Sequence, residues 1–174
     1  MLIDPGTGAY YSDAKLRARL GGWEAHNGPV PETGRRGPER MGPFLWARHH
    51  EPPRLRLEAD AAVACLACDG PFVKRKVRLS DGELEILDSV CNSLPHCVTW
   101  MLAPDWRIAP FGDGRFRLSH EDGTRLMLEF EGLDALGIEC VDVEVSPRFL
   151  ELRPSKAVRL SFTRELRTLV RFAI

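Results

Sequence analysis

The stretch VKRKVRLSDGELEILD, residues 73–88, contains the pattern of two strands joined by a tight turn. Residues 73–79 alternate apolar and charged side chains, although not cleanly, which is the two-residue period of a half-buried strand, and residues 84–88 fit its partner strand. Between them, residues 80–83 read Ser-Asp-Gly-Glu, a sequence that favours a hairpin turn. The stretch therefore predicts an antiparallel β-hairpin.

The same pattern recurs along the chain after residue 50. Short alternating or apolar runs separated by turn residues occupy residues 54–58, 63–68, 97–102, 115–118, 125–130, 138–145, 157–162 and 166–172. Strands of this length and spacing are typical of an antiparallel sandwich or barrel. A helical pattern occurs at residues 15–20, with Ser12 as its cap and Gly21–Gly22 at its end. We therefore expect a mainly β protein with one short helix.

The length and composition of the chain limit the classes of protein to which it can belong. A chain of 174 residues suits one domain and is long enough to bury a core without disulfides or metals. Its apolar runs are far shorter than the roughly 20 residues that span a bilayer, and its first residues lack the basic and apolar regions of a signal peptide. We expect no membrane partner, and the localisation stays open.

Charge is distributed unevenly along the chain. Residues 1–80 carry 13 Lys/Arg against 9 Asp/Glu, residues 81–145 carry 4 against 14, and residues 146–174 carry 7 against 2. The net charge of −1 gives no reason to expect a nucleic-acid partner. The basic ends are compatible with a face that meets an acidic sugar polymer, and solvated strand faces would give the same distribution.

The cysteines favour a structural role over a metal site. Cys65 and Cys68 have the spacing of a zinc ligand pair, but no second pair with similar spacing follows among the five cysteines. Free cysteine packs as a small hydrophobe, so we interpret this pair as part of a strand.

Two polar features flank the predicted helix. Asp4-Pro5-Gly6 is a turn signature, and His26-Asn27 follows about two dozen residues later. From the residues alone, Asp4 fits an Asx-turn and His26 fits a core histidine whose ring binds a backbone carbonyl. Residues 27–43 are rich in Pro and Gly and predict a long surface loop, which is often functional.

Three residues beside this loop are candidates for substrate binding. Trp23 precedes the His26-Asn27 pair and Trp46 follows the loop, and both indole rings could stack on sugar rings. Asn27 itself is the third candidate. No complete acid–base pair for catalysis can be assigned in this chain.

The block from Asp4 to Asn27 resembles the C-terminal β-sandwich domain of the heparinase II/III-like polysaccharide lyases. The matching residues are Asp4-Pro5-Gly6-Thr7, Ala9-Tyr10, Ser12-Asp13, Arg17 and Ala25-His26-Asn27. Segments at 42–44, 74–77, 84–88, 102–104, 146–149 and 166–170 follow in the family's order and spacing. The likeness covers nearly the whole chain, but only the first block is specific.

The resemblance implies an antiparallel sandwich of supersandwich-like sheets over residues 1–174. It also implies a preceding α/α-toroid and a first strand with a His-x-His-x-Asp motif, which we expect to lie outside this chain. The family performs β-elimination on polysaccharides that contain uronic acid, and its members tend to be secreted or periplasmic. Asp4 and His26 would then be two of three protein ligands of a structural zinc ion, an incomplete site in this chain.

These implications leave two functional hypotheses. The chain is either the sandwich domain of such a lyase, inactive alone and partnered by the toroid, or a free-standing non-catalytic module that binds carbohydrate or another protein. In both cases an acidic polysaccharide is the expected ligand of the basic face. A sheet edge left uncovered beside Met1 would also favour pairing with a second copy of the chain.

Overall fold

The computed structural model describes residues 1–8, 13–33, 39–42, 45–47, 52–67, 72–91, 94–132 and 137–172. Within these residues the elements are α1 (Ala14–Leu20), the 3-10 helix η1 (Trp23–Ala25), β1 (Val30–Pro31), β2 (Glu39–Arg40), β3 (Trp46–Ala47), β4 (Arg54–Leu57), β5 (Ala61–Ala67), β6 (Phe72–Ser80), β7 (Glu83–Val90), β8 (His96–Met101), β9 (Trp106–Pro110), β10 (Arg115–His120), β11 (Arg125–Glu131), β12 (Gly137–Arg148), β13 (Glu151–Phe162) and β14 (Glu165–Phe172).

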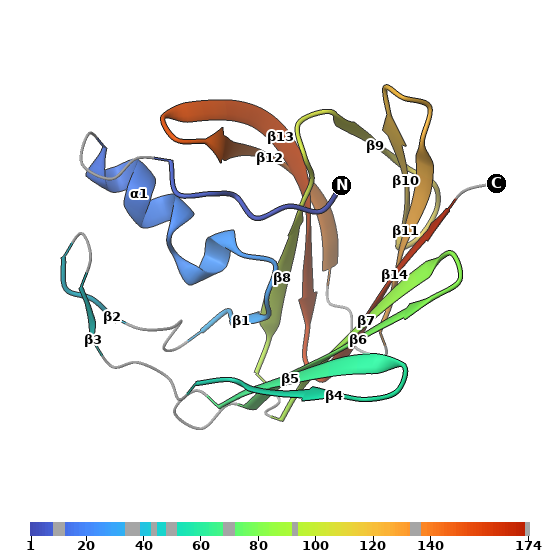
Figure 1. Ribbon diagram of the computed structural model, residues 1–174, viewed down its shortest axis with the longest axis horizontal. Coiled ribbons are helices and arrows are strands. Elements are labelled where there is room, and N and C mark those ends of the chain that lie inside the picture. Colours follow the sequence, from blue (N-terminus) through green and yellow to red (C-terminus); the bar gives the residue numbers. More distant parts are fainter. Residues whose placement is uncertain are drawn as a thin grey trace.

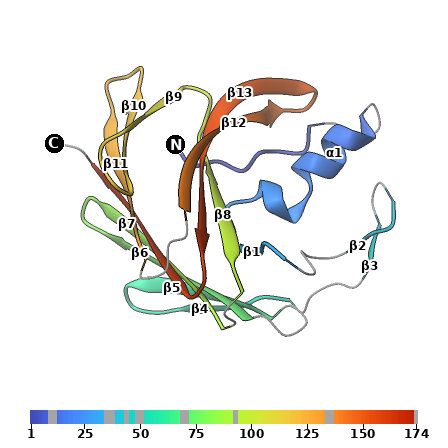
Figure 2. The same ribbon diagram turned by 180° about the vertical axis from the view of Figure 1, so that it is seen from behind.

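The strands form two large antiparallel sheets that pack against each other (Figures 1 and 2). One has eight strands in the order β4-β5-β6-β7-β14-β11-β10-β9, and the other has four in the order β1-β8-β13-β12. A two-stranded ribbon, β2-β3, lies with α1 on the side of the four-stranded sheet away from the large sheet. The predicted antiparallel sandwich with one short helix is confirmed. Among the described residues, no helix is long and apolar enough to cross a bilayer.

The hairpin at residues 73–88 forms as predicted. β6 and β7 pair from Ser80↔Glu83 outward, so that Asp81 and Gly82 make a two-residue turn. Gly82 has a φ of 75°, a left-handed conformation that glycine adopts without steric cost. The register places Val77 opposite Ile86 on the face that looks toward the four-stranded sheet.

The core lies between the inner faces of the two sheets. β8 and β13 contribute alternate residues from one side, among them Trp100, Leu160 and Phe162, and the large sheet contributes Leu118, Leu128 and Leu166 from the other. All of these are buried. Burying each such side chain stabilises the fold by about 1.5–3 kcal/mol relative to leaving it in water.

The helix differs from its prediction at its start. α1 begins at Ala14, and the carboxylate Oδ1 of Asp13 accepts a hydrogen bond of 2.8 Å from the Leu16 amide. Asp13 is therefore the N-cap, while the predicted cap, Ser12, lies outside the described residues. Gly21 ends the helix as predicted, and Leu20 anchors it in the protein interior.

Two residues of the predicted 27–43 loop belong to the sandwich. Val30 and Pro31 form β1, pair with Cys97 and His96 of β8, and are buried. Residues 34–38 and 43 of this segment lie outside the described residues. The predicted loop thus contains a short edge strand, which begins two residues beyond His26-Asn27.

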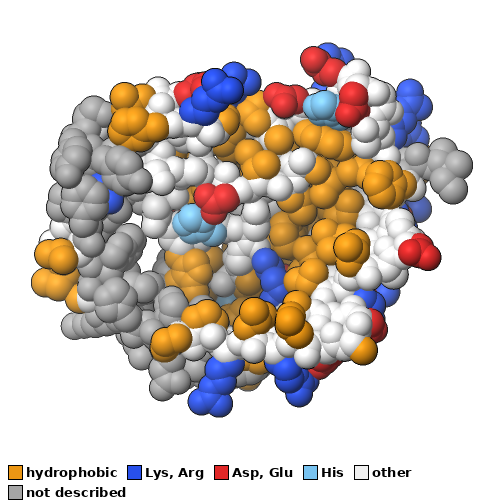
Figure 3. All heavy atoms as spheres, viewed as in Figure 1, with side chains coloured by type: hydrophobic (Ala, Val, Ile, Leu, Met, Phe, Trp, Pro, Cys, Tyr) orange, Lys and Arg blue, Asp and Glu red, His pale blue; other side chains and the backbone are white. Residues whose placement is uncertain are grey.

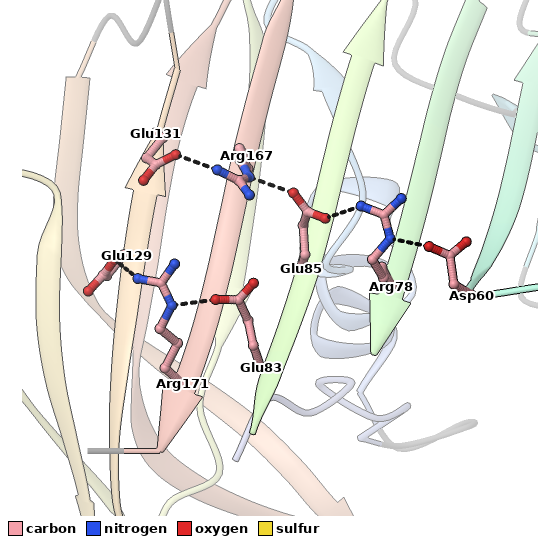
Figure 4. Close-up of polar contacts among 8 residues, drawn as sticks. All are labelled: Asp60, Arg78, Glu83, Glu85, Glu129, Glu131, Arg167 and Arg171. Atoms are coloured by element: carbon pink, nitrogen blue, oxygen red, sulfur yellow. Dashed lines mark hydrogen bonds and ion pairs between the residues drawn. The ribbon is translucent and has the colours of Figure 1, made fainter. Parts of the chain in front are cut away.

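The outer face of the large sheet carries a ladder of ion pairs that crosses several strands (Figure 4). Its members are Asp60, Arg78, Glu83, Glu85, Glu129, Glu131, Arg167 and Arg171. Arg167 joins Glu85 at 2.5 Å and Glu131 at 2.9 Å, so one guanidinium links three strands. Hydrogen bonds from Arg167 lower the pKa of Glu85. Because its arginines are held by carboxylates, this ladder is a poor surface for an acidic polymer.

Candidate functional site

The two predicted metal ligands, Asp4 and His26, are in contact. Oδ2 of Asp4 lies 2.6 Å from Nδ1 of His26, although the residues are 22 positions apart. The other carboxylate oxygen of Asp4 accepts a hydrogen bond of 2.9 Å from the Gly6 amide, which makes an Asx-turn. Both side chains are open to solvent. One carboxylate therefore shapes the turn and faces the imidazole at the same time.

The N-terminal segment holds Asp4 at the end of β8. Leu2 pairs with Leu102, the Ile3 amide donates to the Met101 carbonyl at 3.0 Å, and the Ala103 amide donates to the Met1 carbonyl at 2.7 Å. These contacts hold residues 1–3 against the end of β8 through one isolated antiparallel bridge. Asp4 follows it directly, so the four-stranded sheet fixes where the turn begins.

Gly6 fixes the other side of the turn against β12. The Ser146 amide donates to the Pro5 carbonyl at 2.7 Å, and Gly6 has a φ of 77°. A Cβ on Gly6 would lie 2.2 Å from the Ser146 carbonyl oxygen, so glycine is required both by conformation and by space. The Asp4 carboxylate is thus held from two directions.

Asn27 joins the two halves of the site. Its Nδ2 donates to the Ile3 carbonyl at 2.9 Å, and its Oδ1 accepts from the Met101 amide at 3.0 Å. The carboxamide therefore bridges the N-terminal segment and β8, and it holds the neighbouring His26 beside Asp4. Asn27 was predicted as a substrate-binding residue, and this bridging role was not foreseen.

The two tryptophan candidates are placed differently. Trp23 starts η1, is half-buried, and its carbonyl accepts the His26 amide at 3.2 Å, so it belongs to the same turn as His26. The backbone of Trp46 pairs with Arg40 in the β2-β3 ribbon. The side chain of Trp46 lies outside the described residues. The structure thus brings together Asp4, Trp23, His26 and Asn27.

Asp4 and His26 fit zinc by their donor chemistry, since zinc accepts carboxylate oxygen and imidazole nitrogen. A structural zinc site has four ligands and a catalytic one three plus water. Among the described residues, no group of three or more His, Cys, Asp or Glu side chains is arranged to hold a metal ion. The pair therefore offers part of a coordination sphere.

A cavity of about 340 Å³ lies beside the pair, on the outer face of the four-stranded sheet. It is lined by Glu24, Gly28, Val30, Pro31, Glu32, Cys97, Thr99 and Arg159. Glu24 and Gly28 stand two residues to either side of His26, so the cavity adjoins the candidate site along the chain. Burial raises the pKa of the Cys97 thiol, which disfavours a reactive thiolate there.

This cavity was missed by sequence reasoning because only strand pairing assembles it. Cys97 and Thr99 come from β8, Arg159 from β13 and Glu32 from the residue after β1. The carboxylates, the hydroxyl and the guanidinium among the lining residues offer hydrogen-bond partners to a polar ligand such as a sugar.

The sequence matches no protein-family model and no curated protein. Solved structures are similar in fold. A heparinase III with methylated lysines aligns at a TM-score of 0.74 with 13% identity, over 99% of this chain and 28% of its own. A heparan sulfate lyase from Pedobacter heparinus aligns at 0.73 with 14% identity, over 98% and 28%. Another heparinase III structure aligns at 0.72 with 10% identity. The fold is therefore that of a part of these lyases, and the chain spans about 28% of their length.

Proposed function

We propose that this chain is the β-sandwich part of a polysaccharide lyase of the heparinase II/III type and presents the Asp4–His26 corner to an acidic polysaccharide. The observation that carries the proposal is the 2.6 Å contact between these two side chains. Asp4 and His26 lie near the two ends of the Asp4–Asn27 block, the block whose resemblance to the family is specific. Gly6 and Asn27 belong to the same block and hold the two side chains in place. The shared fold with three lyase structures supports the same proposal.

The proposed reaction is β-elimination next to a uronic acid. A base removes the C5 proton, the sugar carboxylate is neutralised, and an acid protonates the departing 4-oxygen. The reaction needs both a base and an acid, and among the described residues the Asp4–His26 corner offers one imidazole, that of His26. We propose that polypeptide beyond these 174 residues completes the acid and base pair. We therefore expect this chain alone to bind the polymer without cleaving it.

A zinc ion is the proposed cofactor, held by Asp4 and His26 with further donors from outside the described residues. When bound, the ion would act as a structural cross-link between the two arms of the site. The chain's own residues prepare this arrangement: Gly6 orients the Asp4 carboxylate, and Asn27 holds His26 against the N-terminal segment.

The zinc proposal predicts a thermal stabilisation that depends on His26. Added Zn²⁺ should raise the melting temperature of the chain, because a ligand at 100 times its Kd stabilises the folded state by about 2.7 kcal/mol. The shift should disappear in His26→Ala. His120→Ala is the matched control, since His120 makes a comparable 3.0 Å contact with Asp122 at a distant turn. An equal shift in wild type and His26→Ala would refute zinc binding at this pair.

The second candidate function is a module that binds another protein chain. The observation that favours it is a set of exposed leucines on the inner face of the large sheet, Leu55, Leu57 and Leu79. Contiguous exposed apolar surface of this kind marks interaction sites. In this case the basic ends of the chain would be ordinary solvated strand faces.

A further inference from the structure

Four arginines project from the outer face of β9, β10 and β11, at the end of the large sheet opposite β4. Alternate residues of these strands pack into the core, so the residues between them face outward. These include Arg107, Arg115, Arg117 and Arg125, which are all exposed. Figure 3 shows Lys and Arg side chains at the edge of the molecule where Figure 1 places β10 and β11.

The local composition of the chain does not account for this gathering of positive charge. Residues 81–145 contain 4 Lys/Arg against 14 Asp/Glu, and the four arginines of β9–β11 are all of the Lys/Arg in this segment. The sheet thus brings every Lys and Arg side chain of an acidic segment to one surface. We call Arg107, Arg115, Arg117 and Arg125 the arginine patch.

Cross-strand pairing sets the spacing of the arginine patch. Ser119 of β10 pairs with Arg107 of β9 on one side and with Arg125 of β11 on the other. Arg117 is the next outward-facing residue of β10, and its partners on both neighbouring strands are uncharged. Because neighbouring strands lie about 4.8 Å apart, these three arginines start from backbone positions within roughly 10 Å of one another.

The arginine patch differs from the ladder of ion pairs on the same face (Figure 4). In the ladder, guanidinium groups bind carboxylates on neighbouring strands. Arg115 lies opposite Glu129, but the Glu129 carboxylate binds Arg171 at 2.7 Å. Among the described residues, no carboxylate lies within ion-pair distance of a guanidinium of the arginine patch. The N–H donors of these guanidinium groups are therefore available to an anion from outside.

Two members of the arginine patch are positioned by an aromatic ring. The guanidinium carbons of Arg117 and Arg115 lie 4.5 and 6.0 Å from the centre of the Phe111 ring. A Cβ on Gly112 would lie 3.2 Å from Nη2 of Arg115, so glycine leaves room for this guanidinium. A guanidinium that stacks on a ring keeps the N–H donors in its plane free. The ring therefore orders the two side chains before a ligand binds, which lowers the entropic cost of binding.

We propose that the arginine patch is a second anchoring surface for the acidic polysaccharide, which holds sulfate or carboxylate groups of the polymer away from the Asp4–His26 corner. The proposal rests on the proposed function for the class of its ligand. Guanidinium groups bind such oxyanions through paired N–H donors. The arginine patch lies on the outer face of the large sheet, whereas the corner lies beside the end of β8 in the other sheet. Different segments of one polymer therefore meet the two surfaces.

The surroundings of the arginine patch favour a polymer with widely spaced charges over a nucleic acid. Asp113 and Glu121 are exposed in the turns at the two ends of β10. Duplex DNA carries one charge per about 1.7 Å of its axis, so phosphates beyond the patch would meet these carboxylates. A polysaccharide carries its anionic groups at intervals of a sugar unit and can place them on the arginines alone. Because each exposed contact is weak, the patch contributes mainly to the binding of long chains, whose contacts act together.

Binding of long dextran sulfate chains, which contain no uronic acid, tests the arginine patch separately from the corner. The double variant Arg117→Gln, Arg125→Gln should bind about tenfold more weakly than wild type at low salt. Its affinity should also fall less as salt rises, because fewer charge contacts remain to be screened. The matched control is Arg54→Gln, Lys74→Gln, which removes the same charge from two exposed residues in one row at the β4 end of the same face. This control should bind as wild type does.

The outcomes separate this proposal from the proposed function. Circular dichroism and thermal melts verify that both double variants remain folded. No binding of dextran sulfate by wild type, or equal affinity in wild type and Arg117→Gln, Arg125→Gln, would overturn the anchoring surface. A polythymidine strand that binds the patch more tightly than dextran sulfate does would overturn the choice of a polysaccharide. His26→Ala should leave the binding of dextran sulfate unchanged, so a failure of the corner appears only with polymers that contain uronic acid.

Discussion

Asp88→Ala should destabilise the protein by about 3 kcal/mol or more, because it leaves a partly buried guanidinium without its partner. Asp88 is fully buried on β7, and both of its oxygens accept hydrogen bonds from Arg75 on β6. The Arg75 guanidinium also lies 4.9 Å from the centre of the Trp100 ring, which fixes it inside the sandwich. Urea unfolding of wild type and variant measures the loss.

Two controls separate the buried pair from ion pairing in general. Asp142→Ala removes the partner of Lys156 in an exposed pair and should destabilise the protein far less than Asp88→Ala does. The double change Arg75→Met with Asp88→Leu should recover much of the loss, because an apolar pair of similar volume carries no desolvation cost. An Asp88→Ala loss no larger than that of Asp142→Ala would contradict this interpretation.

The same pair predicts a pH dependence when Arg75 is removed. Burial raises the pKa of Asp88, and Arg75 opposes that shift. In Arg75→Met the folded state should therefore bind the Asp88 proton more tightly than the unfolded state does. The contribution of Asp88 to the free energy of unfolding should then be greatest at acid pH and fall as the pH rises through the pKa of the unfolded carboxyl and beyond. Urea unfolding should therefore show the stability of Arg75→Met falling relative to that of wild type over this range, and a relative stability that rises would refute the prediction.

Gly6→Ala should destabilise the chain and disrupt the candidate site together. The left-handed φ of residue 6 costs alanine about 1–2 kcal/mol, and the new Cβ would meet the Ser146 carbonyl oxygen at 2.2 Å. The backbone must shift, and Asp4 shifts with it because its carboxylate binds the Gly6 amide. Hydrogen exchange at the Ile3 amide should accelerate as the N-terminal segment loosens.

Gly82→Ala is the matched control for Gly6→Ala. Gly82 has nearly the same φ, 75°, but open space where a Cβ would lie. Gly82→Ala should lower the free energy of unfolding only by the cost of the left-handed φ. It should leave hydrogen exchange at the Ile3 amide unchanged. Equal losses at the two glycines would show that the contact with Ser146 does not constrain the turn.

Most of the sandwich was predictable because its strands carry local signals. The Asp81-Gly82 turn and the apolar–charged patterns of the residues on either side of it are short-range features, and the structure forms that hairpin as predicted. β1 was not predicted, because Val30-Pro31 is too short to show a period and forms only against β8. The unequal width of the two sheets could not be predicted either. Leu57 and Ile86 are both apolar residues in strand-like runs, and they differ only in what covers them in the fold.

The candidate site was predictable only in part. The motif resemblance singled out Asp4 and His26, and the structure brings them into contact. The bridge made by Asn27 depends on Met101, 74 residues away, and no local pattern signals a contact at that distance. The cavity around Arg159 was missed for the same reason, because three separate strands and a turn contribute its walls.

The most direct test of the central proposal is a calorimetric titration of heparan sulfate fragments into wild type and into His26→Ala. The account predicts saturable binding that weakens with salt, because exposed charges are screened, and that is at least tenfold weaker in His26→Ala. His120→Ala should bind as wild type does. No binding by wild type, or equal affinity in wild type and His26→Ala, would contradict the proposal that the Asp4–His26 corner meets an acidic polysaccharide.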